Sequence, residues 1–136
     1  MNQGFGLDPV PGFDRLTPDN AQLQLINSVK AGQSFLLNRV RTVIGRSDPP
    51  QIIVDIDLTE CDPNLQNNDP PAVSRRHALI EWVNGQLQII DLGSKNGTYV
   101  DGKKLASANA DQPSDPTPLK LGSQIFIANL ELKVIN

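Results

Sequence analysis

The sequence predicts an all-β fold, an antiparallel β-sandwich of about eleven strands with long surface loops. From Gln22 onward, apolar residues occur in short runs rich in Ile, Val and Leu. Several runs alternate apolar with polar residues, as Leu130, Leu132 and Val134 do, and this period of two is typical of a half-buried strand. No window of about eleven residues sustains a helical period. Frequent turn signals between such runs favour a sandwich or a barrel.

The candidate strands can be taken in chain order. They cover residues 22–29, 34–39, 42–46, 51–56, 77–83, 86–92, 98–100, 103–106, 117–121, 124–129 and 130–135. Two of the connections, Asn84-Gly85 and Asp101-Gly102, consist of residues that adopt positive φ readily. Each predicts a tight two-residue hairpin between its flanking strands.

The chain divides into a short head and one domain. Residues 1–20 carry three prolines and three glycines without apolar periodicity, so we expect a flexible tail or linker there. Residues 21–136 then form the sandwich domain. The head contains Thr17-Pro18, a candidate phosphorylation site that a second copy of the domain could recognise.

Composition excludes several classes of protein. Twelve basic and 15 acidic side chains give a net charge of −3, which argues against nucleic acid as the main partner. One cysteine, Cys61, excludes an internal disulfide, and with the single His77 it cannot form an ordinary zinc site. No apolar run approaches the length of a membrane span, and no signal peptide is visible. We therefore expect a protein without metal, cofactor or direct membrane insertion, located in the cytoplasm or, as a fragment of a larger anchored protein, at the cytoplasmic face of a membrane.

An acidic segment interrupts the strand pattern. Between Arg46 and Arg75 the chain has six carboxylates and no Lys or Arg. Within it, residues 58–73 are rich in proline and polar residues, which favours a long solvated surface loop. A calcium-binding loop is the alternative, but the DxDxDG spacing that such loops use is absent. Residues 107–116 predict a second loop of similar character.

Three connections carry the residues best suited to chemistry. They are Gly45-Arg46-Ser47, Ser74-Arg75-Arg76-His77 and the segment from Gly93 to Thr98. A guanidinium offers a planar fork of donors that suits phosphate or carboxylate, and serine and asparagine offer donors and acceptors to a peptide. Taken singly, each also has an ordinary interpretation as a surface arginine, a turn serine, a structural histidine or an Asn-Gly turn.

The three motifs in this order resemble those of the forkhead-associated (FHA) domain, a module that recognises phosphothreonine peptides. The resemblance covers about residues 22–135, although the acidic segment makes the spacing from Arg46 to Ser74 longer than is usual in that family. It implies an eleven-stranded sandwich and a phosphopeptide site on its loops. The ligand-contacting residues it implies are Arg46, Ser74, Arg75, Lys95 and Asn96. The residues it implies as structural support are Gly45, His77 and Gly97.

The roles that the resemblance implies are specific. Arg46 and Ser74 grip the phosphate, and Arg75 adds a further contact. Lys95 stands where the family often has a hydroxyl residue, and Asn96 hydrogen-bonds the ligand backbone. A phosphate near neutral pH carries about −1.5 to −2 charge and three acceptor oxygens, so this donor set matches it. Arg76 and Thr98 have no assigned role.

The predicted function is phosphothreonine-dependent protein–protein interaction that recruits partners phosphorylated by a Ser/Thr kinase. The alternative is a phospho-independent scaffolding or oligomerisation sandwich. An enzyme with Ser74 as nucleophile and His77 as base is disfavoured, because the chain has no GxSxG elbow and two arginines follow the serine.

Overall fold

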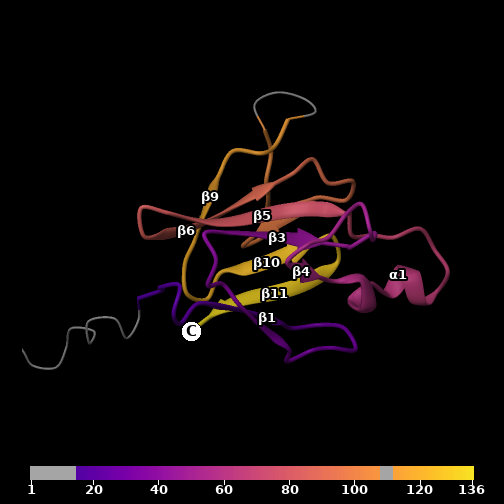
Figure 1. The fold of residues 1–136 in the computed structure, drawn as a ribbon, viewed down its shortest axis with the longest axis horizontal. Coiled ribbons are helices and arrows are strands. Elements are labelled where there is room, and N and C mark those ends of the chain that lie inside the picture. Colours follow the sequence, from indigo (N-terminus) through magenta and orange to yellow (C-terminus); the bar gives the residue numbers. More distant parts are fainter. Residues whose placement is uncertain (1–14, 108–111) are drawn as a thin grey trace, which may run out of the picture.

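The computed structural model describes residues 15–107 and 112–136 of the chain and confirms the all-β sandwich (Figure 1). Eleven strands lie within these residues: β1 (Gln22–Leu25), β2 (Ser34–Leu36), β3 (Arg41–Gly45), β4 (Ile56–Asp57), β5 (Arg76–Val83), β6 (Gln86–Asp91), β7 (Thr98–Val100), β8 (Lys103–Lys104), β9 (Thr117–Leu119), β10 (Gln124–Ile127) and β11 (Leu130–Ile135). One sheet has the order β2-β1-β11-β10-β7-β8, and the other has the order β4-β3-β5-β6-β9.

The two sheets enclose one apolar core, as the alternation in the sequence predicts. In the first sheet, Leu23 of β1 and Leu132 of β11 are fully buried, and in the second, Ile44 of β3 and Ile89 of β6 are fully buried. Each such side chain contributes roughly 1.5–3 kcal/mol through removal of its surface from water. The polar residues between them point outward, so the core fixes the register of the strands.

The predicted hairpins are confirmed. Asn84 and Gly85 have φ of 52° and 79°, and Asp101 and Gly102 have φ of 50° and 83°. Two successive residues at positive φ match the right-handed twist of the strands that they join.

The run 51–56 differs from the prediction of a strand. Ile52 pairs with Asp48 in an isolated bridge, through N–H to carbonyl distances of 2.8 and 3.0 Å, so these residues turn back on themselves. Only Ile56 of the run belongs to a strand. This strand, β4, lies parallel to β3, so the sandwich is not antiparallel throughout.

Segment 58–73 also differs from a solvated loop. It contains a 3-10 turn over Thr59–Cys61 and a short helix α1 over Pro63–Gln66 (Figure 1). Leu58 and Cys61 join the core, and only residues 66–70 form a continuous exposed stretch. Buried apolar residues therefore occur at both ends of the segment. Each end is too short to show a hydrophobic period in the sequence.

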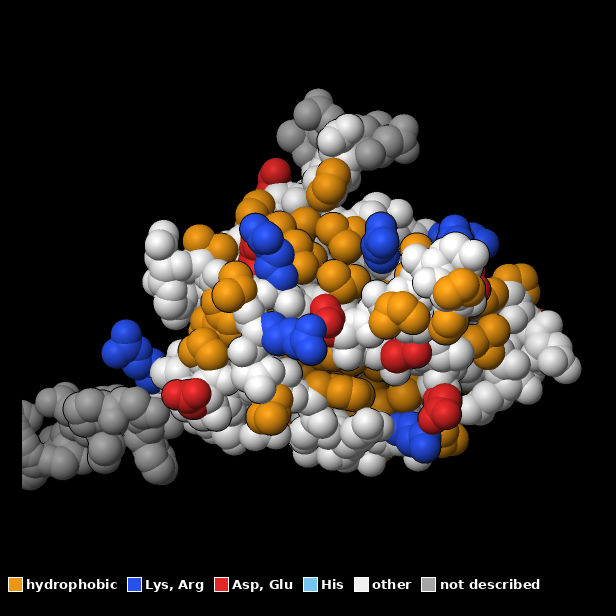
Figure 2. All heavy atoms as spheres, viewed as in Figure 1, with side chains coloured by type: hydrophobic (Ala, Val, Ile, Leu, Met, Phe, Trp, Pro, Cys, Tyr) orange, Lys and Arg blue, Asp and Glu red, His pale blue; other side chains and the backbone are white. Residues whose placement is uncertain are grey.

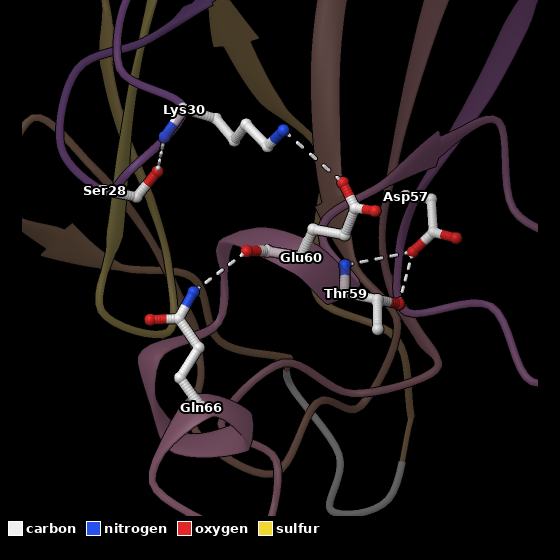
Figure 3. A network of polar contacts seen from close by, with 6 residues as sticks. All are labelled: Ser28, Lys30, Asp57, Thr59, Glu60 and Gln66. Carbon is white, nitrogen blue, oxygen red and sulfur yellow. Dashed lines mark hydrogen bonds and ion pairs between the residues drawn. The ribbon is translucent and has the colours of Figure 1, made fainter.

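Polar contacts fix this segment to the rest of the sandwich (Figure 3). Lys30, in the β1–β2 connection, lies 3.6 Å from the carboxylate of Glu60, and the side-chain amide of Gln66 donates to the Glu60 carbonyl at 3.3 Å. The Asp57 carboxylate accepts from the N–H and the hydroxyl of Thr59. The base of the segment therefore has a defined position.

The remaining predictions concern the head, the second loop and ligand classes. Residues 1–14 and 108–111 lie outside the described residues, and Thr17 to Asn20 form a turn in which the hydroxyl of Thr17 accepts from the N–H of Asp19. Over the described ranges, no helix has the length and apolar character needed to cross a bilayer. Those ranges also contain no cluster of three or more side chains that could hold a metal ion.

Candidate functional site

The three predicted motifs meet at one end of the sandwich. Because β3 and β5 are antiparallel, the end of β3 lies beside the start of β5, and Gly45 pairs with Arg76 there. The connection from β6 to β7 reaches the same end, where the buried His77 contacts Gly97. Segment 58–73 and α1 lie at this end as well (Figure 1). Loops held by rigid sheets are the usual place for a binding site.

Gly45 allows two backbones to approach closely. A Cβ on this residue would collide with the carbonyl oxygen of Arg75 and lie 2.8 Å from that of Ser74. The next N–H, that of Arg46, is shared between the carbonyls of Ser74 at 3.2 Å and Arg75 at 3.0 Å. The glycine is therefore required sterically at the point where the first motif contacts the second.

Arg46 projects from this contact as a partly buried side chain. Its Nε donates to the carbonyl of Val73 at 3.2 Å, which fixes the plane of the guanidinium. Among the described residues, no hydrogen bond or ion pair involves its two terminal nitrogens. A fork held through Nε presents these nitrogens to an oxyanion in the geometry that bidentate binding needs.

Ser74 connects the second motif to the third. Its Oγ accepts from the N–H of Lys95 at 3.0 Å, and its own N–H donates to Nδ1 of His77 at 3.0 Å. Since Oγ accepts from the backbone, its hydroxyl hydrogen is the part that can donate to a ligand.

His77 is fully buried, and both of its ring nitrogens have partners. Nδ1 accepts from the N–H of Ser74, and Nε2 lies 2.8 Å from the carbonyl of Gly97, so Nε2 carries the hydrogen and donates it. Burial lowers the pKa of His77 below its ordinary value, consistent with the neutral ring that these partners require. The histidine joins two loops, and it is not oriented as a base toward the Ser74 hydroxyl.

Asn96 and Lys95 form the exposed tip of the third motif. The side-chain amide of Asn96 donates through Nδ2 to the carbonyl of Ala72 at 2.8 Å. This bond fixes the orientation of the side-chain amide and leaves Oδ1 as an acceptor for a ligand. Arg75 is more than half exposed, and its guanidinium lies 3.7 Å from the carboxylate of Asp48. Arg76 is exposed at the start of β5.

The shape of the third motif depends on Asp91, which the sequence analysis missed. This carboxylate is 8% exposed and accepts from four donors: the N–H groups of Gly93 and Ser94 and the hydroxyls of Ser94 and Thr98. Burial by itself would raise the pKa of Asp91, but the hydrogen bonds from Ser94 and Thr98 outweigh it and hold the pKa below its ordinary value. Thr98 is fully buried, so its role is structural.

Two further residues escaped the sequence analysis. Asp62 is fully buried and accepts from the backbone N–H groups of Ala72 and Val73. Lys104 of β8 lies against the third motif, with its Cε 3.1 Å from the position that a Cβ on Gly97 would occupy. The turn pattern around Asp91 was visible in the sequence, whereas nothing in the local sequence marks Asp62 or Lys104.

These features define the class of protein: a β-sandwich whose loops at one end gather cationic, hydroxyl and amide side chains around shared backbone contacts. The FHA domain model matches residues 42–128, and the chain belongs to this family. Membership indicates a non-catalytic interaction module. The resemblance to the FHA family that the three motifs indicate is thereby confirmed.

Individual relatives agree with this assignment. The glycogen accumulation regulator GarA of Mycobacterium tuberculosis is 35% identical over 99 residues, covering 73% of this chain and 52% of the relative. The oxoglutarate dehydrogenase inhibitor of Corynebacterium diphtheriae is 30% identical over 136 residues, covering 99% of this chain and 79% of the relative. The chain thus spans about half the length of the mycobacterial relatives.

A solved structure shares the fold. Mycobacterium tuberculosis EmbR in complex with a low-affinity phosphopeptide superposes with a TM-score of 0.62 at 26% identity. The match covers 85% of this chain and 24% of EmbR. The likeness therefore concerns one domain of a larger protein.

Proposed function

We propose that this domain binds a phosphothreonine-containing segment of a partner protein and so recruits partners that a Ser/Thr kinase has phosphorylated. The observation that carries the proposal is the set of side chains at one end of the sandwich. Arg46, Ser74 and Lys95 come from three separate motifs and lie on loops that share hydrogen bonds. Two cations and a hydroxyl suit a doubly charged oxyanion with three acceptor oxygens.

The remaining site residues suit the peptide. The Oδ1 of Asn96 can accept from a backbone N–H beside the phosphothreonine, because Nδ2 is held by Ala72. Arg75 can add charge when the phosphate competes with Asp48 for it. EmbR supports this assignment, since it was solved with a phosphopeptide. The names of GarA and the dehydrogenase inhibitor, a regulator and an inhibitor, support a protein partner.

The test compares a phosphothreonine peptide library with its unphosphorylated counterparts by calorimetry. We expect binding to the phosphorylated members only. Arg46→Ala should weaken it by about 2 kcal/mol or more, because a charged partner of the phosphate is lost. Arg41→Ala is the matched control, since Arg41 is exposed and paired with Glu81 at the start of β3, away from the motifs. Equal affinity for both forms of the peptides contradicts the proposal.

A phospho-independent surface is the second candidate. Leu36 and Ile53 are 58% and 68% exposed and line a groove of about 440 Å³ between the edges of the two sheets. Apolar side chains are also visible among the mixed charges on the face in Figure 2. If Arg46→Ala combined with Ser74→Ala retained a native partner, this groove would be the candidate contact.

A further inference from the structure

Asp62 is a charged residue type with no exposed surface, at the base of the acidic segment. One carboxylate oxygen accepts from the N–H of Ala72 at 2.8 Å and of Val73 at 3.0 Å. The other accepts from the N–H of Asn64 at 3.0 Å, at the start of α1. A single buried carboxylate therefore closes the loop from residue 62 to residue 73.

The two residues that Asp62 holds are also bonded on their other side. The carbonyl of Ala72 accepts from Nδ2 of Asn96 at 2.8 Å, and the carbonyl of Val73 accepts from Nε of Arg46 at 3.2 Å. Asp62 is thus linked, through the backbone of Ala72 and Val73, to two side chains that the proposed function assigns to the ligand.

Removing the carboxylate has consequences on both bridges. Ala72 and Val73 are 6% and 1% exposed, so their N–H groups would lose their partners without gaining water. The dipeptide would rotate to recover hydrogen bonds, and its carbonyls would turn with it. The Arg46 fork and the Asn96 amide would then lose the contacts that fix their orientation.

We propose that Asp62 is a positioning residue for phosphopeptide recognition, which sets the orientation of Arg46 and Asn96 through the backbone of Ala72 and Val73. The inference rests on the proposed function for its ligand but makes a separate statement about geometry. It also gives the base of the acidic segment a role in the site, whereas the hydrogen bonds of the exposed tip at residues 66–70 run to residues 60–65 of the same segment.

The experiment measures binding of a phosphothreonine peptide to variants that remain folded by circular dichroism. Asp62→Ala should weaken binding about tenfold or more, since two ligand contacts lose their alignment. Asp62→Asn keeps the volume of the side chain and one acceptor, so its affinity for the peptide should lie between those of Asp62→Ala and the wild type. If Asp62→Ala does not fold, Asp62→Asn alone carries the comparison with the wild type.

Two controls separate positioning from general stability. Ser123→Ala removes the buried acceptor of the Lys120 N–H, away from the site, and should lower stability while leaving the affinity within about twofold. Asn68→Gly changes the exposed tip of the same segment and should also leave affinity unchanged.

A spectroscopic measurement tests the geometry without ligand. The Nε–H resonance of Arg46 and the side-chain amide resonances of Asn96 should shift in Asp62→Asn and stay in place in Ser123→Ala. Unshifted resonances, or binding by Asp62→Asn within about twofold of the wild type, would overturn the inference. If the wild-type domain does not prefer the phosphorylated peptide, the proposed function fails instead, and the resonances still decide the role of Asp62.

Discussion

Two of the three loops that form the candidate site are each held by one buried aspartate, and the two aspartates accept hydrogen bonds over different distances along the chain. Asp91 accepts from donors two, three and seven residues ahead. Asp62 accepts from backbone donors ten and eleven residues ahead, besides the one at α1. The loop closed by Asp62 is the longer of the two, so closing it costs more chain entropy.

The loops also differ in charge. In the first, Arg75 has an acidic neighbour in Asp48 at 3.7 Å. Lys95 of the second loop, and Lys104 of the neighbouring β8, form no ion pair with a carboxylate in the described part of the chain. The second loop and β8 therefore contribute uncompensated cations, and the first loop contributes an arginine that a ligand must compete for.

The largest expected effect on stability comes from comparing two glycines of the site, Gly45 beside the second motif and Gly97 in the third. Gly45→Ala places a Cβ against backbone carbonyls that cannot move independently, so we expect a loss of about 3 kcal/mol or more in the free energy of unfolding. Gly97→Ala should cost only about 1–2 kcal/mol, because its φ of 88° is unfavourable but its nearest contact is the flexible end of Lys104. Urea denaturation measures both, and equal losses would contradict the steric argument.

Removing the charge of Asp91 is the next test. Asp91→Asn loses acceptors for the N–H and hydroxyl donors of its loop and should destabilise the domain by about 2–3 kcal/mol near neutral pH. Since the pKa of Asp91 is held below its ordinary value of 3.8, the stabilisation is present above that value and is lost as the pH falls below it.

The difference in unfolding free energy between wild type and Asp91→Asn should therefore be constant above about pH 5 and shrink below about pH 4. The pKa of Asp57 is also lowered, but Asp57 is present in both proteins and its contribution cancels in the difference. Denaturation curves across this range provide the measurement. A difference that does not depend on pH would show that the charge of Asp91 is not what holds the loop.

The sequence separation of the contacts explains which features of the fold and the site could be predicted from the sequence. Alternation, the Asn84-Gly85 and Asp101-Gly102 turns and the three motifs are local signals, and they located the strands and the loops. The contact between Asn96 and Ala72 joins residues 24 positions apart, and the Arg46 contact with Val73 joins residues 27 apart. No local pattern encodes such a pairing, so the acidic segment was interpreted as solvated when its base is part of the core.

The strand predicted at 51–56 failed for a related reason. Its residues have the composition of a buried strand, yet Ile53 is 68% exposed because Ile52 pairs with Asp48 and not with a neighbouring strand. Apolar composition shows that a segment can be buried, and partner strands decide whether it is.

His77 links the two loops, so replacing it tests whether they act together. His77→Gln should cost about 2 kcal/mol near neutral pH, since it disturbs the bonds to Ser74 and Gly97. Burial lowers the pKa of His77 from 6.5, so the unfolded chain takes up a proton first as the pH falls. Wild-type stability should then decline below pH 6.5 until the lowered pKa is reached, and the variant should lack this decline in urea titrations. The same slope in both proteins would assign it to another group.

The smallest expected effect concerns the lysines of β8, which lies beside the second loop. Lys104 is opposite Tyr99, and Lys103 is opposite Val100, so adjacent lysines of β8 point to opposite sides of the sheet. Lys104→Gln should weaken phosphopeptide binding about twofold to threefold at low salt, and less at high salt, because an exposed charge near the ligand is screened. Lys103→Gln removes the same charge from the other side and should have a smaller effect. Calorimetry at two ionic strengths decides the matter: equal losses would mean that only net charge counts, and a selective loss in Lys104→Gln would extend the site onto β8.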